Sequence, residues 1–241
     1  MKLDDRIARA GELAEIYPAA RDLLIFYREL ARFQKIIREP ADLDALLPHF
    51  PALLELVRRA GPEPLAEFGS RHLQSEEARE NLLRACWEGD VETEQGRFYA
   101  RVLLQPYAES LASRGSVDLA TMSAECPFCG ARPVAAVLRG EGDGGKRWLV
   151  CSLCSTEWPF RRVLCPGCGA EDKERLPVYT SPDIAHVRVE ACDACRTYIK
   201  SIDLTRDGRA VPVVDEIATV ALNIWAENHG YTKVEANLLG M

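Results

Sequence analysis

The stretch that decides the fold opens with Cys126-Pro127-Phe128-Cys129-Gly130 and continues to Cys195. It contains four Cys-x-x-Cys pairs, which use eight of the nine cysteines in the chain: Cys126/Cys129, Cys151/Cys154, Cys165/Cys168 and Cys192/Cys195. Two residues between cysteines allow both thiolates to turn toward one point, and four thiolates make a tetrahedral site for zinc or iron. Four pairs therefore predict two four-cysteine metal sites.

The intervals between the pairs indicate how they combine. Residues 130–150 separate the first pair from the second and residues 169–191 separate the third from the fourth, both close to the spacing of zinc ribbons. The segment Cys-Pro-Phe-Cys-Gly-Ala at 126–131 also recurs as Cys-Pro-Gly-Cys-Gly-Ala at 165–170, which indicates an internal repeat. The predicted ligand sets are Cys126, Cys129, Cys151 and Cys154 for the first site, and Cys165, Cys168, Cys192 and Cys195 for the second.

Each repeat unit is expected to fold as a small hairpin between two cysteine turns. In the first unit the strands would be 134–138 and 147–150, joined by a loop over 140–145. The glycine that follows each Cys-Pro-x-Cys turn can adopt the positive φ that ends such a turn. The metals would then hold together two folds that are too small to have an adequate core of their own.

Other uses of paired cysteines fit this sequence less well. Disulfides require an oxidising compartment, and residues 1–6 lack the apolar segment of an export signal, so we do not expect an exported protein with structural disulfides. A thioredoxin-like redox pair normally occurs once in a chain. Cys86 has no partner at this spacing and is expected to be a small buried apolar side chain.

Charge argues against a nucleic-acid-binding ribbon. The 241-residue chain has a formal net charge of −7, and residues 126–203 carry eleven Lys/Arg against ten Asp/Glu. Thiolates make this region more negative still, whereas ribbons that bind nucleic acid present a basic surface. A closed four-cysteine site also leaves no coordination position for a substrate, and no catalytic triad, phosphate loop or dinucleotide motif stands out. We therefore expect a protein that is not an enzyme.

The predicted fold class is α+β, with an α-helical domain followed by two small modules and a C-terminal helix. Helices are expected over 18–39, over 76–88 with Ser75 as N-cap and Gly89 as stop, and over 93–114. Asp207-Gly208 would join strands 201–206 and 210–214, ahead of a final helix over 215–229. The predicted domains are 1–122 (helical), 123–164 (first module), 165–206 (second module) and 207–241 (strand, helix and tail).

Specific segments add a resemblance to this outline. They are Cys-Pro-Phe-Cys-Gly (126–130), Trp-Leu-Val-Cys-Ser-Leu-Cys-Ser-Thr-Glu-Trp (148–158), Arg-Val-Leu-Cys (162–165), Glu-Ala-Cys-Asp-Ala-Cys-Arg-Thr-Tyr-Ile-Lys (190–200), and the closing helix as far as Gly230-Tyr231. Together they resemble the formate dehydrogenase accessory protein FdhE family. The resemblance implies a helical domain followed by two rubredoxin-like modules that bind iron. It also implies a non-catalytic, cytoplasmic assembly factor that binds the catalytic subunit of a formate dehydrogenase during its maturation.

Residues that follow the second cysteine pair of each unit are the candidates for contact with that partner. Trp158 and Tyr198 follow the second pair of each unit at similar distances, and they either anchor an interface or complete the miniature core of the unit. Arg161, Arg162 and Lys200 are candidate charges at the rim of the contact, or ordinary solvated surface residues. The main alternative function is an iron-based redox protein that acts on the maturing enzyme.

Overall fold

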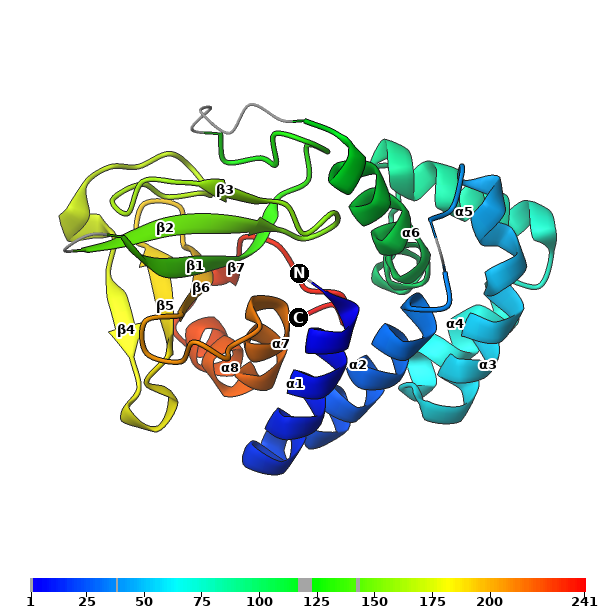
Figure 1. The fold of residues 1–241 in the computed structure, drawn as a ribbon, viewed down its shortest axis with the longest axis horizontal. Helices are drawn as coiled ribbons and strands as arrows, with labels where there is room; N and C mark the ends of the chain where they lie inside the picture. Colours follow the sequence, from blue (N-terminus) through cyan, green and yellow to red (C-terminus); the bar gives the residue numbers. More distant parts are fainter. Residues whose placement is uncertain (1, 38, 117–122, 142–143) are drawn as a thin grey trace.

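The computed structural model describes residues 2–37, 39–116, 123–141 and 144–241. In this part of the chain eight α-helices and a seven-stranded mixed sheet make an α+β fold, as predicted (Figure 1). The helices are α1 (Leu3–Ile16), α2 (Arg21–Gln34), α3 (Phe50–Ala60), α4 (Glu63–His72), α5 (Glu76–Glu88), α6 (Glu94–Arg114), α7 (Pro212–Ala218) and α8 (Val220–Asn228). None of these helices combines the length and apolarity that a membrane span requires.

The helices of the N-terminal half begin and end largely where local signals place them. The Ser75 side chain accepts a hydrogen bond from the Ala78 N–H at the start of α5, and Gly89 ends this helix with a φ of 91°. The predicted helices over 76–88 and 93–114 are confirmed. The helix predicted over 18–39 is shorter, because a 3-10 turn precedes α2 and regular helix ends at Gln34. Residue 38 lies outside the described part.

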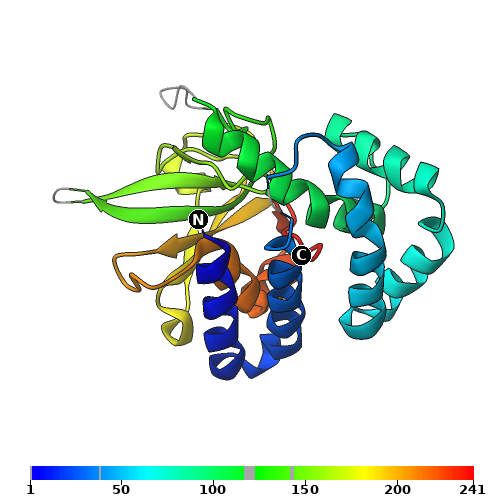
Figure 2. The ribbon, with the colours of Figure 1, turned by 45° about the vertical axis from the view of Figure 1, so that its right-hand side comes forward.

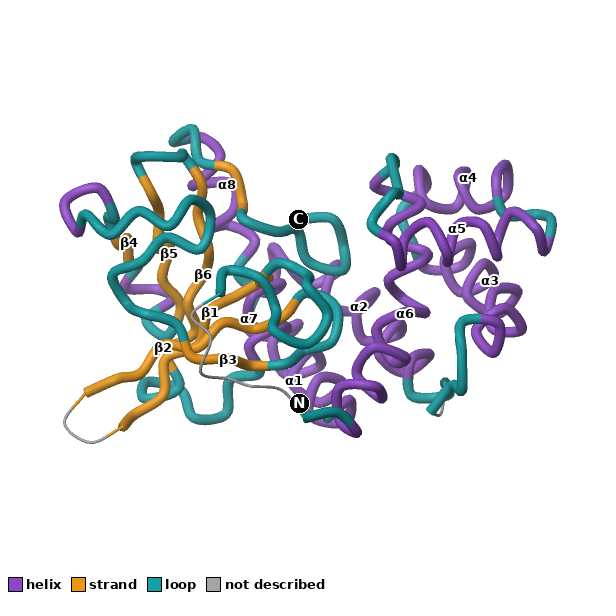
Figure 3. Tube along the Cα trace, turned by 90° about the horizontal axis from the view of Figure 1, so that it is seen from above, coloured by secondary structure: helices purple, strands orange, loops and turns teal. Residues whose placement is uncertain are grey.

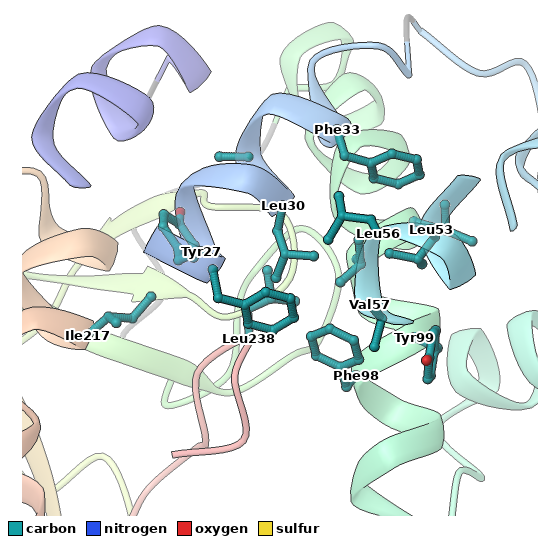
Figure 4. Close-up of a cluster of buried hydrophobic side chains, with 14 of the residues drawn as sticks. Tyr27, Leu30, Phe33, Leu53, Leu56, Val57, Phe98, Tyr99, Ile217 and Leu238 are labelled. Carbon is teal, nitrogen blue, oxygen red and sulfur yellow. The ribbon is translucent and has the colours of Figure 1, made fainter. Parts of the chain in front are cut away.

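One apolar core joins these helices to the C-terminal part of the chain. Leu30, Phe33, Leu53 and Phe98 are buried in its centre, and Leu238 from the C-terminal tail packs among them (Figure 4). Ile217 of α7 belongs to the same core. Helices α3, α4 and α5 lie on the side away from the sheet, and α1, α2 and α7 lie between them and the sheet (Figures 1, 2 and 3). The helical domain is therefore completed by residues from the other end of the chain.

The two cysteine modules share one sheet. Its strands are β1 (Pro133–Glu141), β2 (Gly144–Cys151), β3 (Glu157–Pro159), β4 (Val178–Thr180), β5 (Val187–Cys192), β6 (Thr197–Asp203) and β7 (Thr232–Lys233). The strand order is β3-β2-β1-β6-β5-β4, with β7 on β6. Each module forms antiparallel pairs, and a parallel pairing of β1 with β6, with Ala136 opposite Ser201, joins the two modules.

The structure contains the hairpin that was predicted for the first module, whereas the predicted domain limits stay a prediction. The predicted hairpin of the first module is present, with longer strands than expected, and residues 142–143 of its loop lie outside the described part. The division of the chain after residues 122, 164 and 206 stays a prediction, and residues 117–122 before its first limit are also outside the described part.

The prediction of a second strand over 210–214 is wrong. Pro212 opens α7 instead, because its fixed φ suits the first turn of a helix, and the Val211 N–H donates to the Asp215 carboxylate at 2.7 Å. The helix predicted over 215–229 is divided into α7 and α8 at Thr219. Both backbone and side-chain oxygens of Thr219 accept hydrogen bonds from the Lys200 ammonium, at 3.2 Å each.

Two neighbouring carboxylates of α7 are completely buried. Asp215 accepts hydrogen bonds from the Arg9 guanidinium of α1, at 2.6 and 3.0 Å, and pairs with His186 at 2.9 Å. Acidic residues near the start of a helix usually favour the helix dipole. Their burial shows a further role, which is to connect α7 to distant parts of the fold.

Glu216 makes the second set of connections. Its carboxylate lies 2.9 Å from the Lys200 ammonium of β6 and 2.5 Å from that of Lys233 in β7, and it accepts a hydrogen bond from Asn237 at 2.7 Å. Burial by itself would raise the pKa of Glu216, but the two lysines lower it to about 2. Burial also lowers the pKa of Lys200 to about 8, against the effect of Glu216. The carboxylate is therefore held charged between two cations.

Glu216→Gln is expected to destabilise the protein strongly. The substitution keeps the size of the side chain but leaves the buried Lys200 ammonium without its carboxylate, and loss of one partner of a buried ion pair costs about 3–5 kcal/mol. Urea unfolding of the metal-loaded protein measures the change. Glu227→Gln, at an exposed position of α8, is the matched control and should change the free energy of unfolding by less than about 0.5 kcal/mol. Equal effects of the two substitutions would contradict the assignment.

Candidate metal centres

The first four cysteines lie together at one end of the β1–β2 hairpin. The Cys126 and Cys154 sulfurs are 3.6 Å apart, and the Cys129 sulfur lies 3.4 Å from that of Cys151 and 3.5 Å from that of Cys154. Four sulfurs bound tetrahedrally to one ion at roughly 2.3 Å would be about 3.8 Å apart. The arrangement therefore fits one zinc or iron ion, with the four ligands that the sequence pairs together.

The second site repeats this geometry. The Cys165 and Cys195 sulfurs are 3.7 Å apart, and those of Cys168 and Cys192 are 3.8 Å apart. All four lie close enough together to bind one ion. Both predicted sets of four sulfurs are thus brought together in space, and the donor chemistry of each set suits zinc and iron alike.

The same backbone turn builds every cysteine pair. The residue after the second cysteine has a positive φ in all four: 74° at Gly130, 56° at Ser155, 75° at Gly169 and 59° at Arg196. In the first turn the Gly130 N–H donates to the Cys126 carbonyl at 2.9 Å, and Gly169 donates to the Cys165 carbonyl at the same distance. Glycine adopts this conformation without steric cost, whereas Ser155 and Arg196 adopt it under the constraint of the site.

Backbone amides and two threonine hydroxyls lie within hydrogen-bonding distance of the sulfurs. The Leu153 and Cys154 N–H groups donate to the Cys151 sulfur at 3.3 and 3.4 Å. The Thr156 hydroxyl lies 3.1 Å from the Cys154 sulfur, and the Thr197 hydroxyl lies 3.0 Å from that of Cys195. Burial alone would raise the pKa of the Cys195 thiol, but hydrogen bonds from Thr197 and other neighbours lower it to about 7. Such donors stabilise the thiolate that binds a metal.

The two sites differ in their surroundings. Cys126, Cys151 and Cys154 are buried in a cluster that includes Ala108 of α6 and Trp158 of β3. In the second site Cys168 is exposed. The first site is therefore enclosed by the rest of the fold, whereas the second has a ligand in contact with solvent.

This region matches two family models, described as "FdhE, central domain" over residues 125–162 and "FdhE, C-terminal domain" over residues 163–239. A "Protein FdhE homolog" from Aquifex aeolicus is 34% identical over 203 residues, which are 83% of this chain and 71% of that protein. The chain belongs to the FdhE family. A solved structure, the crystal structure of the FdhE protein from Pseudomonas aeruginosa, matches with a TM-score of 0.80 at 25% identity over 98% of this chain and 95% of that one.

Other FdhE homologues match over a smaller share of their length. The protein from Haemophilus influenzae strain PittEE is 32% identical over 54% of this chain and 43% of its own length. For the Pseudomonas putida protein the identity is 37%, over 48% of this chain and 38% of its own length. The matches of this FdhE-family chain to these two therefore cover less than half of either relative.

The residues predicted to contact a partner lie in two different environments. Trp158 and Tyr198 are almost completely buried, and the Trp158 indole donates to the Ser123 carbonyl at 2.9 Å. Their burial favours the role in the core that we considered as the alternative. Arg161 and Arg162 are exposed, and Arg161 pairs with Glu171 at 2.7 Å. The expectation that Lys200 is a surface or rim charge is wrong, because Glu216 and Thr219 bind its ammonium inside the protein.

One further cluster of possible ligands is occupied by an arginine. His186, Asp207 and Asp215 have ligand atoms within 4.8 Å of one another. The Arg9 guanidinium lies 2.7 Å from Asp207 and 2.6 Å from Asp215, where a metal ion would have to bind. This cluster is therefore an ion-pair network between α1 and α7. It was missed in the sequence because Arg9 and Asp215 are 206 positions apart and belong to no motif.

The two sites should release metal at different rates. We expect two metal ions per zinc-loaded chain and a biphasic loss to a coloured chelator, with the fast phase from the second site because Cys168 is exposed. Cys168→Ser should abolish the fast phase. Cys86→Ser, which changes a cysteine outside both sites, should preserve two ions and both phases. A fast phase that persists in the Cys168→Ser variant would contradict this order.

Proposed function

We propose that this chain is a non-catalytic accessory protein that binds the catalytic subunit of a formate dehydrogenase during its maturation in the cytoplasm. The observation that carries the proposal is membership of the FdhE family, with matched family models over both cysteine modules. Eight of the nine cysteines gather in two four-sulfur sets, and binding of metal there requires reduced thiols, which the cytoplasm maintains.

The geometry of the cysteine sites supports a structural role for the metals. Four sulfurs complete the coordination of a tetrahedral ion, so neither site offers an open position to a substrate. Each ion instead would fix two turns at the end of a hairpin, and the pairing of β1 with β6 makes the two hairpins one rigid sheet. In this proposal the surface of that sheet binds the partner, and formate chemistry belongs to the partner.

Association with the enzyme tests this function directly. The tagged, metal-loaded chain is expected to retain the catalytic subunit of a formate dehydrogenase from the same organism when the two are co-expressed anaerobically. Cys126→Ser combined with Cys165→Ser should reduce the retained amount at least about tenfold, because both modules lose a ligand. Cys86→Ser is the control and should retain the wild-type amount. Failure of the wild-type chain to retain the subunit would reject the proposal.

An iron-based redox role is the second candidate, and the exposure of Cys168 is the observation that favours it. An electron can reach a four-sulfur iron site most readily where a ligand contacts solvent. If electron transfer is the function, the anaerobically prepared iron form should be coloured and show a reversible one-electron couple, and Cys168→Ser should shift its potential. An iron-loaded protein without a reversible couple would exclude this candidate.

A further inference from the structure

An open cavity of about 440 Å³ lies beside the second cysteine site. Its wall combines the segment that links the two modules, the segment before β4, and residues of β5 and β6. The apolar lining residues include Val163, Leu164, Leu176, Val178, Ile199 and Val234. A cavity of this size and apolarity is typical of sites that receive a ligand or a large side chain.

The charged residues of the lining are mostly cations. Arg147 and Arg188 both pair with Glu190, at 2.8 and 2.7 Å, and they hold its pKa below the usual range against the effect of burial. Arg162 and Lys173 are exposed and make no ion pair with any residue that the structure describes. Two exposed cations without an ion-pair partner among the described residues therefore border the cavity, which Cys165 and Cys192 of the second site also line.

A buried polar atom in the lining also lacks a partner. Arg147 is only 2% exposed, and its Nε has no hydrogen-bond partner in the described part of the chain. Its Nη1 donates to the carbonyls of Arg161 and Leu164, which fixes the linking segment over the sheet. The two terminal nitrogens of Arg147 thus hold the wall of the cavity together, and its Nε is the donor that remains unused.

The cavity adjoins the free edge of the sheet. The last strand in the order is β4, whose outer edge has no strand partner among the described residues (Figure 1). Val178 of β4 is 51% exposed and Val163 is 43% exposed, so two apolar side chains at the cavity face solvent. An unpaired strand edge next to an apolar cavity is the arrangement to which an extended segment of another protein can add as a strand.

We propose that this cavity and the β4 edge bind an extended acidic segment of the formate dehydrogenase catalytic subunit. An apolar side chain of the segment enters the cavity, its backbone pairs with β4, and adjacent carboxylates pair with Arg162 and Lys173. A small anion would use only the charges, whereas an extended segment uses the cavity, the strand edge and the charges together. The inference rests on the function proposed above and specifies its contact surface.

Substitutions at exposed apolar positions test the surface. Val163→Asp and Val178→Asp place a carboxylate where the apolar side chain of the partner would lie, and each should weaken binding of the catalytic subunit to the metal-loaded chain at least about tenfold. Ile224→Asp is the matched control, because Ile224 is 55% exposed on α8 and lies outside the cavity lining. It should change the affinity less than about twofold. Metal content and unfolding temperature check that each variant is folded.

The charges are tested by Arg162→Gln combined with Lys173→Gln. This variant should bind the subunit about tenfold more weakly at low salt, and its affinity should depend less on salt than that of the wild type, because two screened attractions are removed. Arg58→Gln, at an exposed arginine of α3 that already pairs with Glu55 and lies outside the cavity lining, should bind as the wild type does. Unchanged salt dependence in the double variant would overturn the charge component of the proposal.

The outcomes separate this inference from the function on which it rests. If the wild-type chain binds the subunit and the valine variants bind equally well, the cavity is overturned as the contact surface and the proposed function stands. If the wild-type chain does not bind, the proposed function fails and the occupant named here fails with it. If light scattering shows that Val178→Asp dissociates a dimer of this chain while subunit binding is unchanged, a second copy covers the edge and the inference is overturned.

Discussion

Two adjacent buried carboxylates in α7 form the connection on which the assembled fold depends. Asp215 binds Arg9 of α1 and His186 ahead of β5, whereas Glu216 binds Lys200 of β6, Lys233 of β7 and Asn237 of the tail. A buried ion pair adds little net stability when intact, but a partner left alone in the interior is costly. The ion pairs therefore contribute mainly by making any arrangement in which the helices, the sheet and the tail separate unfavourable, because such an arrangement would leave a buried charge without its partner. The cysteines, by contrast, act locally, each set within one hairpin.

The features predicted correctly from the sequence are those that short segments determine. Two residues between cysteines bring two sulfurs together wherever the turn occurs, so the two sets of four followed from the spacing of the pairs and the internal repeat. Ser75 and Gly89 marked the limits of α5 for a similar reason, because a cap bonds to the backbone only a few residues away. The α+β class follows from the order of such local elements.

The features missed from the sequence depend on residues far apart in the chain. No local pattern separates Lys200, which is buried against Glu216, from a lysine in solvent, and its position in a strand after a cysteine pair suggested the surface. The miss at α7 is partly of this kind: residues 210–214 were predicted as a strand, but Pro212 suits the first turn of a helix, and the Asp215 carboxylate that bonds to the Val211 N–H also binds Arg9 of the distant α1. Tertiary contacts override strand propensity at this point.

The packing of Ile217 and Leu238 into the helical core has a consequence for the order of events during biosynthesis. Helices α1 to α6 emerge from the ribosome first, yet the residues that complete their core are translated only after both cysteine modules. The N-terminal helices therefore keep part of their apolar surface exposed until Ile217 and Leu238 have been synthesised. The modules can acquire their metals during this interval, before the helical domain has reached its final packing. A chain delayed at metal loading would present that unfinished helical surface to the cell for longer.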